Sequence, residues 1–170
     1  MRYIAYIGVA IIFFVIAFFQ NIFFNVFPLV TAPLLLLFIF FYTLIFFEKE
    51  KRYDAVLLYA LLAGTLTDIV NADYIGSSLI VFLIVGFGIM KLKEHIQEQQ
   101  ESHPFVFFLP LFLAVFLFYI GTSTLILYRF QWESTLSRLN QFSILPMILF
   151  NGVAAIILFL IIKPLRRFYV

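Results

Sequence analysis

Six long runs of apolar residues occupy most of this chain and limit what it can fold into. They cover about residues 3–19, 32–47, 55–70, 77–92, 105–128 and 143–162. A helix needs roughly 20 mostly apolar residues to cross a bilayer, with 17–25 the usual range. Each such segment must satisfy its own backbone hydrogen bonds in lipid, and the alternating pattern of a membrane β-barrel is absent. The runs therefore predict an all-α integral membrane protein, with six transmembrane helices in one bundle and a single membrane domain over residues 1–170.

The composition agrees with this class of protein. Of the 170 residues, 65% are hydrophobic and only 12% are charged, whereas ordinary globular domains are about 25% charged. A water-soluble fold of this length has too much surface to cover with so few polar side chains. Residues 1–21 lack the short apolar core and the small-residue cleavage site of a signal peptide, so they are predicted to form a retained first helix.

The positions of Lys and Arg predict the topology, because these residues accumulate in short cytoplasmic loops. If the N-terminus lies in the cytoplasm, nine of the eleven Lys and Arg residues fall in cytoplasmic segments, and only Arg129 and Arg138 fall outside. The nine are Arg2, Lys49, Lys51, Arg52, Lys91, Lys93, Lys163, Arg166 and Arg167. The sequence thus predicts that both termini are cytoplasmic.

Three segments between the apolar runs carry further predictions. Residues 91–104 are expected to continue the fourth helix into the cytosol until Pro104 opens the fifth helix. Residues 20–31 are either a connector at the membrane interface or a tilted extension of the first helix. The leucine spacing in residues 129–142 predicts a short helix that lies on the membrane surface.

The sequence contains no recognisable apparatus for catalysis or metal binding. It has no cysteine, and its two histidines, His95 and His103, both fall in the segment 91–104. Zinc sites need three or four ligands, usually at closer spacing. No glycine-rich phosphate loop, nucleophile elbow or metalloprotease motif occurs. We therefore expect no enzyme activity, no cofactor and no metal site.

The stretch LLAGTLTDIVNADYIGSS (residues 61–78) places a carboxylate, Asp68, near the outer end of an apolar run. Ala60, Gly64 and Asp68 are spaced four residues apart and share one face of the predicted third helix. Small residues let a neighbouring helix approach closely in lipid. A charge at the bilayer centre costs on the order of 3 kcal/mol, and less near the surface. Asp68 is therefore expected to point into the bundle and away from the acyl chains.

Two hypotheses explain Asp68. In the first it is a proton or ion site, the default for an ionisable residue inside a membrane. In the second it is a helix-packing and capping carboxylate, and residues 68–76 form a polar turn. The second hypothesis is favoured, because the predicted spans contain no further acid or base to relay a proton. Asn151, about one turn below the outer end of the last helix, is the first candidate partner for Asp68.

Several of these residues resemble the hallmark of the MreD family of rod shape-determining proteins. That hallmark is a Gly-x-x-x-Asp turn and a later Gly between two central helices, and here Gly64, Asp68 and Gly76 stand at those positions. The family's last helix begins with a Pro and places an Asn five residues on, as Pro146 and Asn151 do.

The resemblance extends over the whole chain through its length, topology and short basic tail. Gln20 fits the glutamine that follows the first helix in the family. Pro33 marks a departure, since many members have an aspartate directly after this proline. The helical face and the resemblance together give six predicted helix-packing and motif residues: Ala60 from the face, and Gly64, Asp68, Gly76, Pro146 and Asn151 from the family motif.

The resemblance also implies a function. Members are non-enzymatic membrane scaffolds of the bacterial elongation (Rod) complex in the inner (cytoplasmic) membrane, where they help control cell shape and peptidoglycan synthesis. The implied direct partner is MreC, a single-span protein with an extracytoplasmic domain. MreB, RodA and a class B transpeptidase belong to the wider complex, membrane lipid surrounds it, and no nucleic acid is expected.

An alternative function follows from the same fold. MreD-like proteins are similar in fold to the substrate-binding subunits of energy-coupling-factor vitamin transporters, which capture a small molecule from outside. Those subunits dock their membrane partner through an Ala-x-x-x-Ala face on helix one. Here Ala5, Gly8, Ala10 and Ala17 do not pair at that spacing, so the scaffold hypothesis is favoured over the transporter subunit.

The basic tail KPLRRFYV has two interpretations. Lys163, Arg166 and Arg167 are predicted to contact anionic lipid headgroups, each contact being worth about 1 kcal/mol near the surface. Alternatively, the three residues only anchor the topology.

Overall fold

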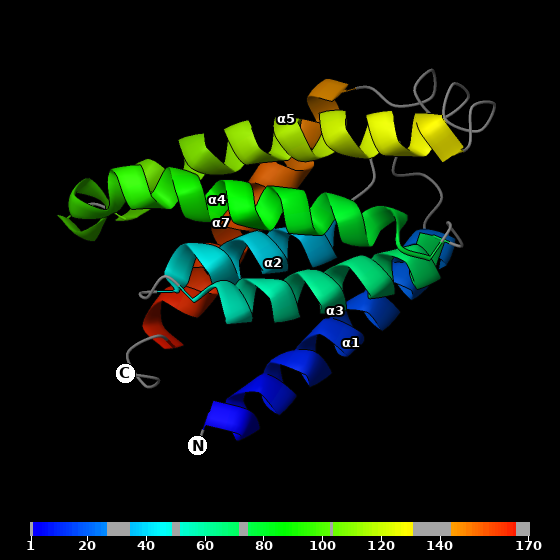
Figure 1. Cartoon of the computed structure of the whole chain (residues 1–170), viewed down its shortest axis with the longest axis horizontal. Coiled ribbons are helices and arrows are strands. Elements are labelled where there is room, and N and C mark those ends of the chain that lie inside the picture. The colour runs from blue at the N-terminus through cyan, green and yellow to red at the C-terminus, as the bar shows by residue number, and fades with distance from the viewer. Residues whose placement is uncertain are drawn as a thin grey trace.

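The computed structural model of the protein describes residues 2–26, 35–48, 52–71, 75–102, 104–130 and 144–165. Every regular element in this part of the chain is an α-helix (Figure 1). The helices are α1 (Arg2–Val26), α2 (Leu36–Phe47), α3 (Tyr53–Asn71), α4 (Ser77–Ser102), α5 (Pro104–Phe130) and α7 (Ile144–Leu165). The predicted all-α class is therefore confirmed, and each of the six apolar runs overlaps one of these helices.

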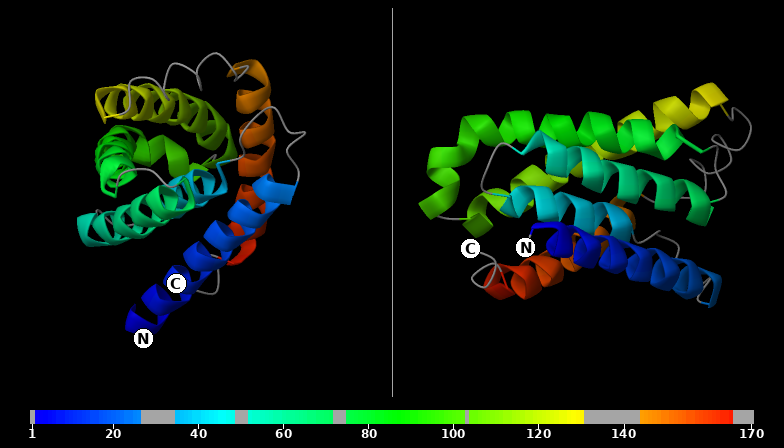
Figure 2. Two further views of the ribbon diagram at one scale, coloured as in Figure 1. Left: turned by 90° about the vertical axis from the view of Figure 1, so that its right-hand side faces the viewer. Right: turned by 60° about the horizontal axis from the view of Figure 1, so that its bottom comes forward.

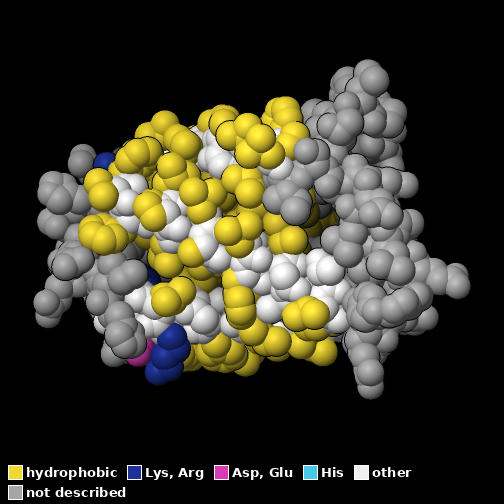
Figure 3. Space-filling view, turned by 90° about the horizontal axis from the view of Figure 1, so that it is seen from above, with side chains coloured by type: hydrophobic (Ala, Val, Ile, Leu, Met, Phe, Trp, Pro, Cys, Tyr) yellow, Lys and Arg dark blue, Asp and Glu magenta, His cyan; other side chains and the backbone are white. Residues whose placement is uncertain are grey.

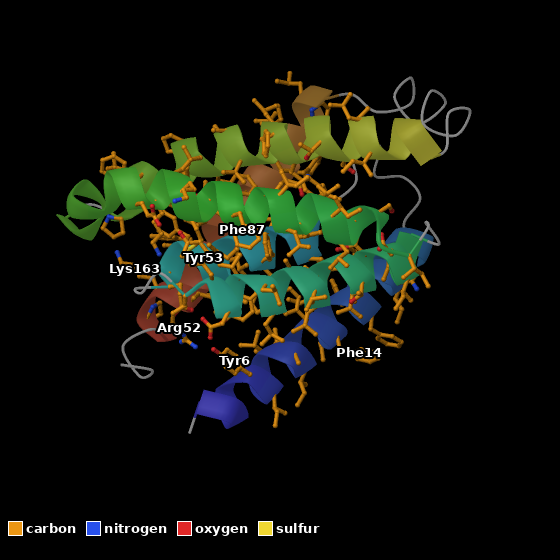
Figure 4. All side chains as sticks on the ribbon, viewed as in Figure 1. Tyr6, Phe14, Arg52, Tyr53, Phe87 and Lys163 are labelled. Atoms are coloured by element: carbon orange, nitrogen blue, oxygen red, sulfur yellow. The ribbon has the colours of Figure 1, made fainter. Side chains whose placement is uncertain are left out.

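Successive helices run in alternating directions, so the connections fall at two opposite ends of the molecule (Figure 1). The start of α1 and the end of α7 lie at the same end, together with the α2–α3 and α4–α5 connections. We call this the basic end, because Arg52 directly before α3 and Lys163 in the last turn of α7 lie there (Figure 4), and Lys93 of α4 contacts Glu48 at the end of α2. The opposite end holds the α3–α4 connection and the start of α2.

Helix α2 is the central element of the bundle. It packs against α1, α3, α4 and α7, and Figure 2 shows it between α3 and α1. Ten of its twelve residues are buried, because it is apolar on every side. At 1.5 Å per residue, its twelve residues extend only about 18 Å, less than the roughly 30 Å of a bilayer's hydrocarbon core. Both ends of α2 therefore need polar partners inside the protein.

Aromatic rings fill the interior of the described bundle. The ring centroids of Phe38 in α2 and Tyr119 in α5 lie 4.3 Å apart. Phe108 in α5 lies 4.6 Å from Phe159 in α7 and 5.0 Å from Phe46 in α2. Such pairs contribute about 0.5–1.5 kcal/mol each beyond the area they bury. The high phenylalanine content thus has a structural use, since the rings join three helices at the centre of the molecule.

The outer surface is largely apolar. Figure 3 shows hydrophobic side chains over most of the described surface on one face. Monomeric soluble proteins rarely expose apolar patches above a few hundred Å², so this surface fits a protein surrounded by a membrane. Within the described residues, α3 (Tyr53–Val70), α5 (Pro104–Ile126) and α7 (Leu145–Pro164) are each long and apolar enough to cross a membrane. The shorter apolar stretches are Tyr6–Ile22 in α1 and Leu36–Phe47 in α2.

Helix boundaries differ from the predicted ones mainly at α1 and α2. Helix α1 continues to Val26, so residues 20–26 extend the first helix, as one of the two interpretations of residues 20–31 required. No proline or glycine interrupts that stretch until Pro28, and Asn21 and Asn25 have only moderately low helix propensity, which does not end a helix. The start of α2 at Leu36 is later than the predicted residue 32. The predicted surface helix within residues 129–142 falls almost wholly outside the described residues.

The segment after α4 follows the prediction. Helix α4 continues to Ser102, and α5 begins at Pro104. Proline is well tolerated in the first turn of a helix, where its missing N–H has no intrahelical partner in any case. The helical hairpin therefore extends beyond the apolar part of α4, which ends near Met90.

Candidate functional site

The carboxylate of Asp68 binds the beginning of the next helix. Asp68 lies in the last turn of α3 and is only 1% exposed. Its Oδ2 accepts a hydrogen bond from the Gly76 backbone N–H at 2.7 Å. Its Oδ1 accepts from the Ser78 backbone N–H at 2.8 Å and from the Ser77 hydroxyl at 3.2 Å. The first N–H groups of a helix lack intrahelical acceptors and carry partial positive charge, so Asp68 supplies both the acceptors and the countercharge for α4.

Gly76 has a backbone conformation that brings its N–H to Asp68. Its φ of 105° lies in the left-handed region, which L-residues rarely adopt because of their Cβ. Its carbonyl accepts the first helical hydrogen bond of α4, from Ile80 N–H at 3.1 Å. The turn therefore needs glycine at this position.

Gly64 lies one turn before Asp68, at a close approach between α3 and α4. A Cβ atom added to Gly64 would lie 2.8 Å from the backbone N of Leu79, and closer still to the Leu79 Cα. Real Cβ atoms essentially never come this near to another backbone. Ala60, one turn earlier on the same face, is fully buried. The small-residue face of α3 is thus buried, and α4 packs against its middle.

Asn151 binds the start of α2 and not Asp68. Its Oδ1 accepts a hydrogen bond from the Leu35 backbone N–H at 2.7 Å, and its Nδ2 donates to the Met147 carbonyl at 2.8 Å. The expected contact between Asn151 and Asp68 is therefore wrong. The physical reason is that unpaired N–H groups at two different helix starts, α2 and α4, each require an acceptor in lipid. Pro146 is half-buried in the first turn of α7, where a proline is well accommodated.

Gln20 provides a second acceptor at the start of α2. It is buried in α1, and its Oε1 accepts a hydrogen bond from the Leu37 backbone N–H at 3.2 Å. Side chains from α1 and α7 therefore bind neighbouring N–H groups of the central helix. Sequence reasoning singled out Gln20 only through the family resemblance and missed this capping contact. The sequence did contain a signal for such a contact, because Gln20 is an amide side chain at the end of a long apolar run.

Lys93 binds the other end of α2. It is 9% exposed, and its ammonium donates hydrogen bonds to the carbonyls of Ile45, at 3.1 Å, and of Glu48. The last carbonyls of a helix lack intrahelical donors and carry partial negative charge. Lys93 therefore satisfies the C-terminal end of α2 from α4. Sequence reasoning counted Lys93 only as a topology signal and did not predict this role.

A polar cluster at the basic end joins α1 to the α2–α3 turn (Figure 4). The Arg52 guanidinium donates to the Tyr6 hydroxyl and lies 3.5 Å from a Glu48 oxygen and 3.6 Å from an Asp54 oxygen. The Tyr6 hydroxyl also donates to Asp54 Oδ2 at 3.4 Å. Burial lowers the pKa of Arg52, but Glu48, Tyr6 and Asp54 outweigh it and raise that pKa above its ordinary value. Arg52 therefore stays positively charged, with the carboxylates of Glu48 and Asp54 beside it.

Of the three basic residues predicted to contact lipid headgroups, the structure describes Lys163. Lys163 is exposed in the last turn of α7, and its Nζ lies 5.8 Å from the ring centroid of Phe159. Arg166 and Arg167 lie outside the described residues, as do the side chains of His95 and His103. Across the described part of the chain, no group of three or more His, Cys, Asp or Glu side chains could hold a metal ion.

Comparison with known proteins gives one family. The family model of MreD, rod shape-determining protein, matches residues 1–169. No curated protein and no solved structure matches the chain.

Proposed function

The chain belongs to the MreD family of rod shape-determining proteins, and from this premise we propose that it is a non-enzymatic scaffold of the bacterial elongation (Rod) complex. In this role it binds MreC directly in the inner membrane. MreB, RodA and a class B transpeptidase belong to the wider assembly, which directs peptidoglycan synthesis and cell shape.

The observation that carries this proposal is that the buried polar side chains serve the structure of the bundle. Asp68, Asn151, Gln20 and Lys93 all bind backbone groups at helix ends. Asp68 therefore supports the packing and capping hypothesis more than the proton or ion hypothesis, because both of its oxygens already accept hydrogen bonds. We propose that Ala60, Gly64, Asp68, Gly76, Pro146 and Asn151 stabilise the bundle that partner proteins bind.

The aromatic interior argues against the alternative of a vitamin-binding subunit. Such a subunit must enclose a polar small molecule, and ligand pockets typically measure about 300–1,000 Å³. At the centre of the described bundle, the rings of Phe38, Phe82, Phe112 and Tyr119 lie within 4.3–6.3 Å of one another in contacting pairs. This packing favours a scaffold, whose partners bind its outer surface.

The lipid-facing helix sides supply that outer surface. Phe14 and Phe18 of α1 and Leu149 of α7 are more than half exposed, and Figure 4 shows Phe14 directed away from the bundle. Partner transmembrane helices pack on such surfaces through van der Waals contacts. At the basic end, Lys163, Arg166 and Arg167 are proposed to contact anionic headgroups of the cytoplasmic leaflet.

Affinity purification in mild detergent, followed by mass spectrometry, tests the scaffold function. We expect an MreC-like protein to co-purify in amounts comparable to the bait. An unrelated six-helix membrane protein with the same tag, expressed to the same level, is the control for non-specific recovery. Recovery of ATP-binding-cassette ATPases in place of an MreC-like protein would support the transporter subunit and overturn the scaffold.

A further inference from the structure

Helix α1 is held to the rest of the bundle unevenly along its length. Its side chains are described over residues 6–22, and the buried ones among them are Phe13, Ala17 and Gln20. The side chains of residues 6–12, next to the basic end, are all half-buried or exposed. The second half of α1 is thus fixed by buried contacts, whereas the first half is not.

Two buried contacts fix the second half of α1 to the central helix. The ring centroid of Phe13 lies 4.8 Å from that of Phe40 in α2, in an edge-to-face arrangement that aromatic pairs prefer. Gln20 Oε1 accepts a hydrogen bond from the Leu37 backbone N–H at 3.2 Å. Hydrogen bonds that are shielded from water are electrostatically stronger than exposed ones. Residues 13–20 therefore form a firm attachment of α1 to α2.

The first half of α1 is attached to α3 through a polar contact. The Arg52 guanidinium donates to the Tyr6 hydroxyl and lies 5.6 Å from the centre of the Tyr6 ring, and Figure 4 shows the two side chains facing each other. The Tyr6 hydroxyl donates in turn to Asp54 Oδ2 at 3.4 Å. Arg52 directly precedes α3, and Asp54 lies in its first turn. One side chain of α1 thus binds two groups at the start of α3.

Apolar packing adds little to this attachment. Val9, one turn after Tyr6, is only half-buried against the core. In a membrane there is no hydrophobic driving force between helices, because lipid tails are as apolar as the side chains that they replace. The balance between an attached and a released first half of α1 therefore depends on the polar contact.

Release of Tyr6 leaves no charge unpaired at the start of α3. Arg52 lies 3.5 Å from a Glu48 oxygen and 3.6 Å from an Asp54 oxygen, and neither ion pair includes Tyr6. The Asp54 side chain is 69% exposed, so water reaches this cluster. A tyrosine hydroxyl is also well accommodated at the membrane–water interface. Both arrangements of α1 therefore satisfy their polar groups.

We propose that the Tyr6–Arg52 contact is a latch. When it is closed, it holds the first half of α1 against α3, and when it opens, that half pivots about the attachment at residues 13–20. The latch is a conformational device of this chain alone, so it does not rest on the scaffold function.

The distance between two spin labels, measured by pulsed electron paramagnetic resonance in lipid nanodiscs, tests the latch. The chain has no cysteine, so Ile84→Cys on α4 can serve as a fixed reference, paired with either Ile7→Cys or Ile22→Cys on α1. All three positions hold exposed side chains. With the latch intact, each pair should give one narrow distance distribution. We expect Arg52→Gln to add a second distance for the pair 7–84 and to leave the pair 22–84 unchanged. Tyr6→Phe, which keeps the ring, should give a smaller change of the same kind.

Tyr53→Phe is the matched control for Tyr6→Phe. The Tyr53 hydroxyl lies at the same end but donates to Glu94 of α4, at 2.7 Å, so its removal should leave both distances unchanged. The latch would be refuted if the pair 7–84 kept its single distance in both Arg52→Gln and Tyr6→Phe. Equal changes in the two label pairs would also refute it, because the whole bundle would then have loosened. A third contrary result is an equal effect of Tyr53→Phe and Tyr6→Phe. If Arg52→Gln does not fold, Tyr6→Phe alone decides the test.

Discussion

At the scale of single residues, Asp68 shows how a membrane protein keeps a buried carboxylate. Its two oxygens accept from Gly76, Ser77 and Ser78, so each oxygen has at least one hydrogen-bond donor. The nearby helix start also provides partial positive charge. These three donors have fixed positions, and they offset the desolvation cost of a buried carboxylate near the outer end of α3. No second ionisable residue is needed for this.

This geometry predicts a graded effect of substitutions at Asp68. Asn is isosteric but replaces one acceptor oxygen with an NH2 group, which faces a backbone or hydroxyl donor. We expect Asp68→Asn to lower the free energy of unfolding by about 1–2 kcal/mol, and Asp68→Ala by about 2–3 kcal/mol, because a buried donor left unpaired costs about 1–3 kcal/mol. The measurement is unfolding by SDS titration in mixed detergent micelles.

A different result would return Asp68 to the ion hypothesis. If Asp68→Asn keeps wild-type stability and still purifies with its partner, but fails to restore rod shape in cells, then the charge has a role beyond capping. Ser77→Ala is a useful comparison, because it removes a single donor and leaves the carboxylate intact.

At the scale of elements, the α3–α4 hairpin depends on a close backbone approach at Gly64. A methyl group there would overlap the backbone of Leu79, which cannot move aside as a flexible side chain can. We expect Gly64→Ala to lower the free energy of unfolding by about 1–3 kcal/mol, the usual cost of overpacking. Gly88→Ala is the control, since a Cβ at Gly88 meets no other atom within 4 Å. A helical Gly→Ala change stabilises by up to about 1 kcal/mol, so equal effects at the two positions would contradict the close approach.

The short central helix α2 depends on side chains from other helices at both ends. Removing the Lys93 ammonium leaves the Ile45 and Glu48 carbonyls without this donor. We expect Lys93→Met, which keeps the aliphatic stem, to lower the melting temperature in detergent and the free energy of unfolding by about 1–3 kcal/mol. Lys91→Met is the matched control, because Lys91 is exposed and pairs with Glu94 at 3.4 Å, a type of surface contact worth about 0–1 kcal/mol. The role of Lys93 would be refuted by equal losses in the two variants.

At the scale of the whole molecule, apolar run length predicts the helices but not their ends. The six helical segments and the α4–α5 junction at Pro104 were predictable, because run length and proline both act locally. The capping contacts of Gln20, Asn151 and Lys93 were not, because each joins helices distant in sequence. The sequence identifies a buried polar side chain as unusual, and only the packing determines which helix end it binds. For this reason the sequence led to the wrong prediction that Asp68 and Asn151 contact each other, whereas each binds the start of a different helix.

The distribution of charge between the two ends predicts the orientation of the whole molecule in the membrane. The chain has no cysteine, so single cysteines can be introduced without background labelling. Ile75→Cys lies at the end opposite the basic end and replaces a side chain that is 86% exposed, while Lys163→Cys lies at the basic end. With Lys and Arg retained on the cytoplasmic side, a membrane-impermeant maleimide should label position 75 in intact cells and position 163 only after the membrane is opened. The reverse pattern would contradict this orientation and would place the basic end outside the cytoplasm.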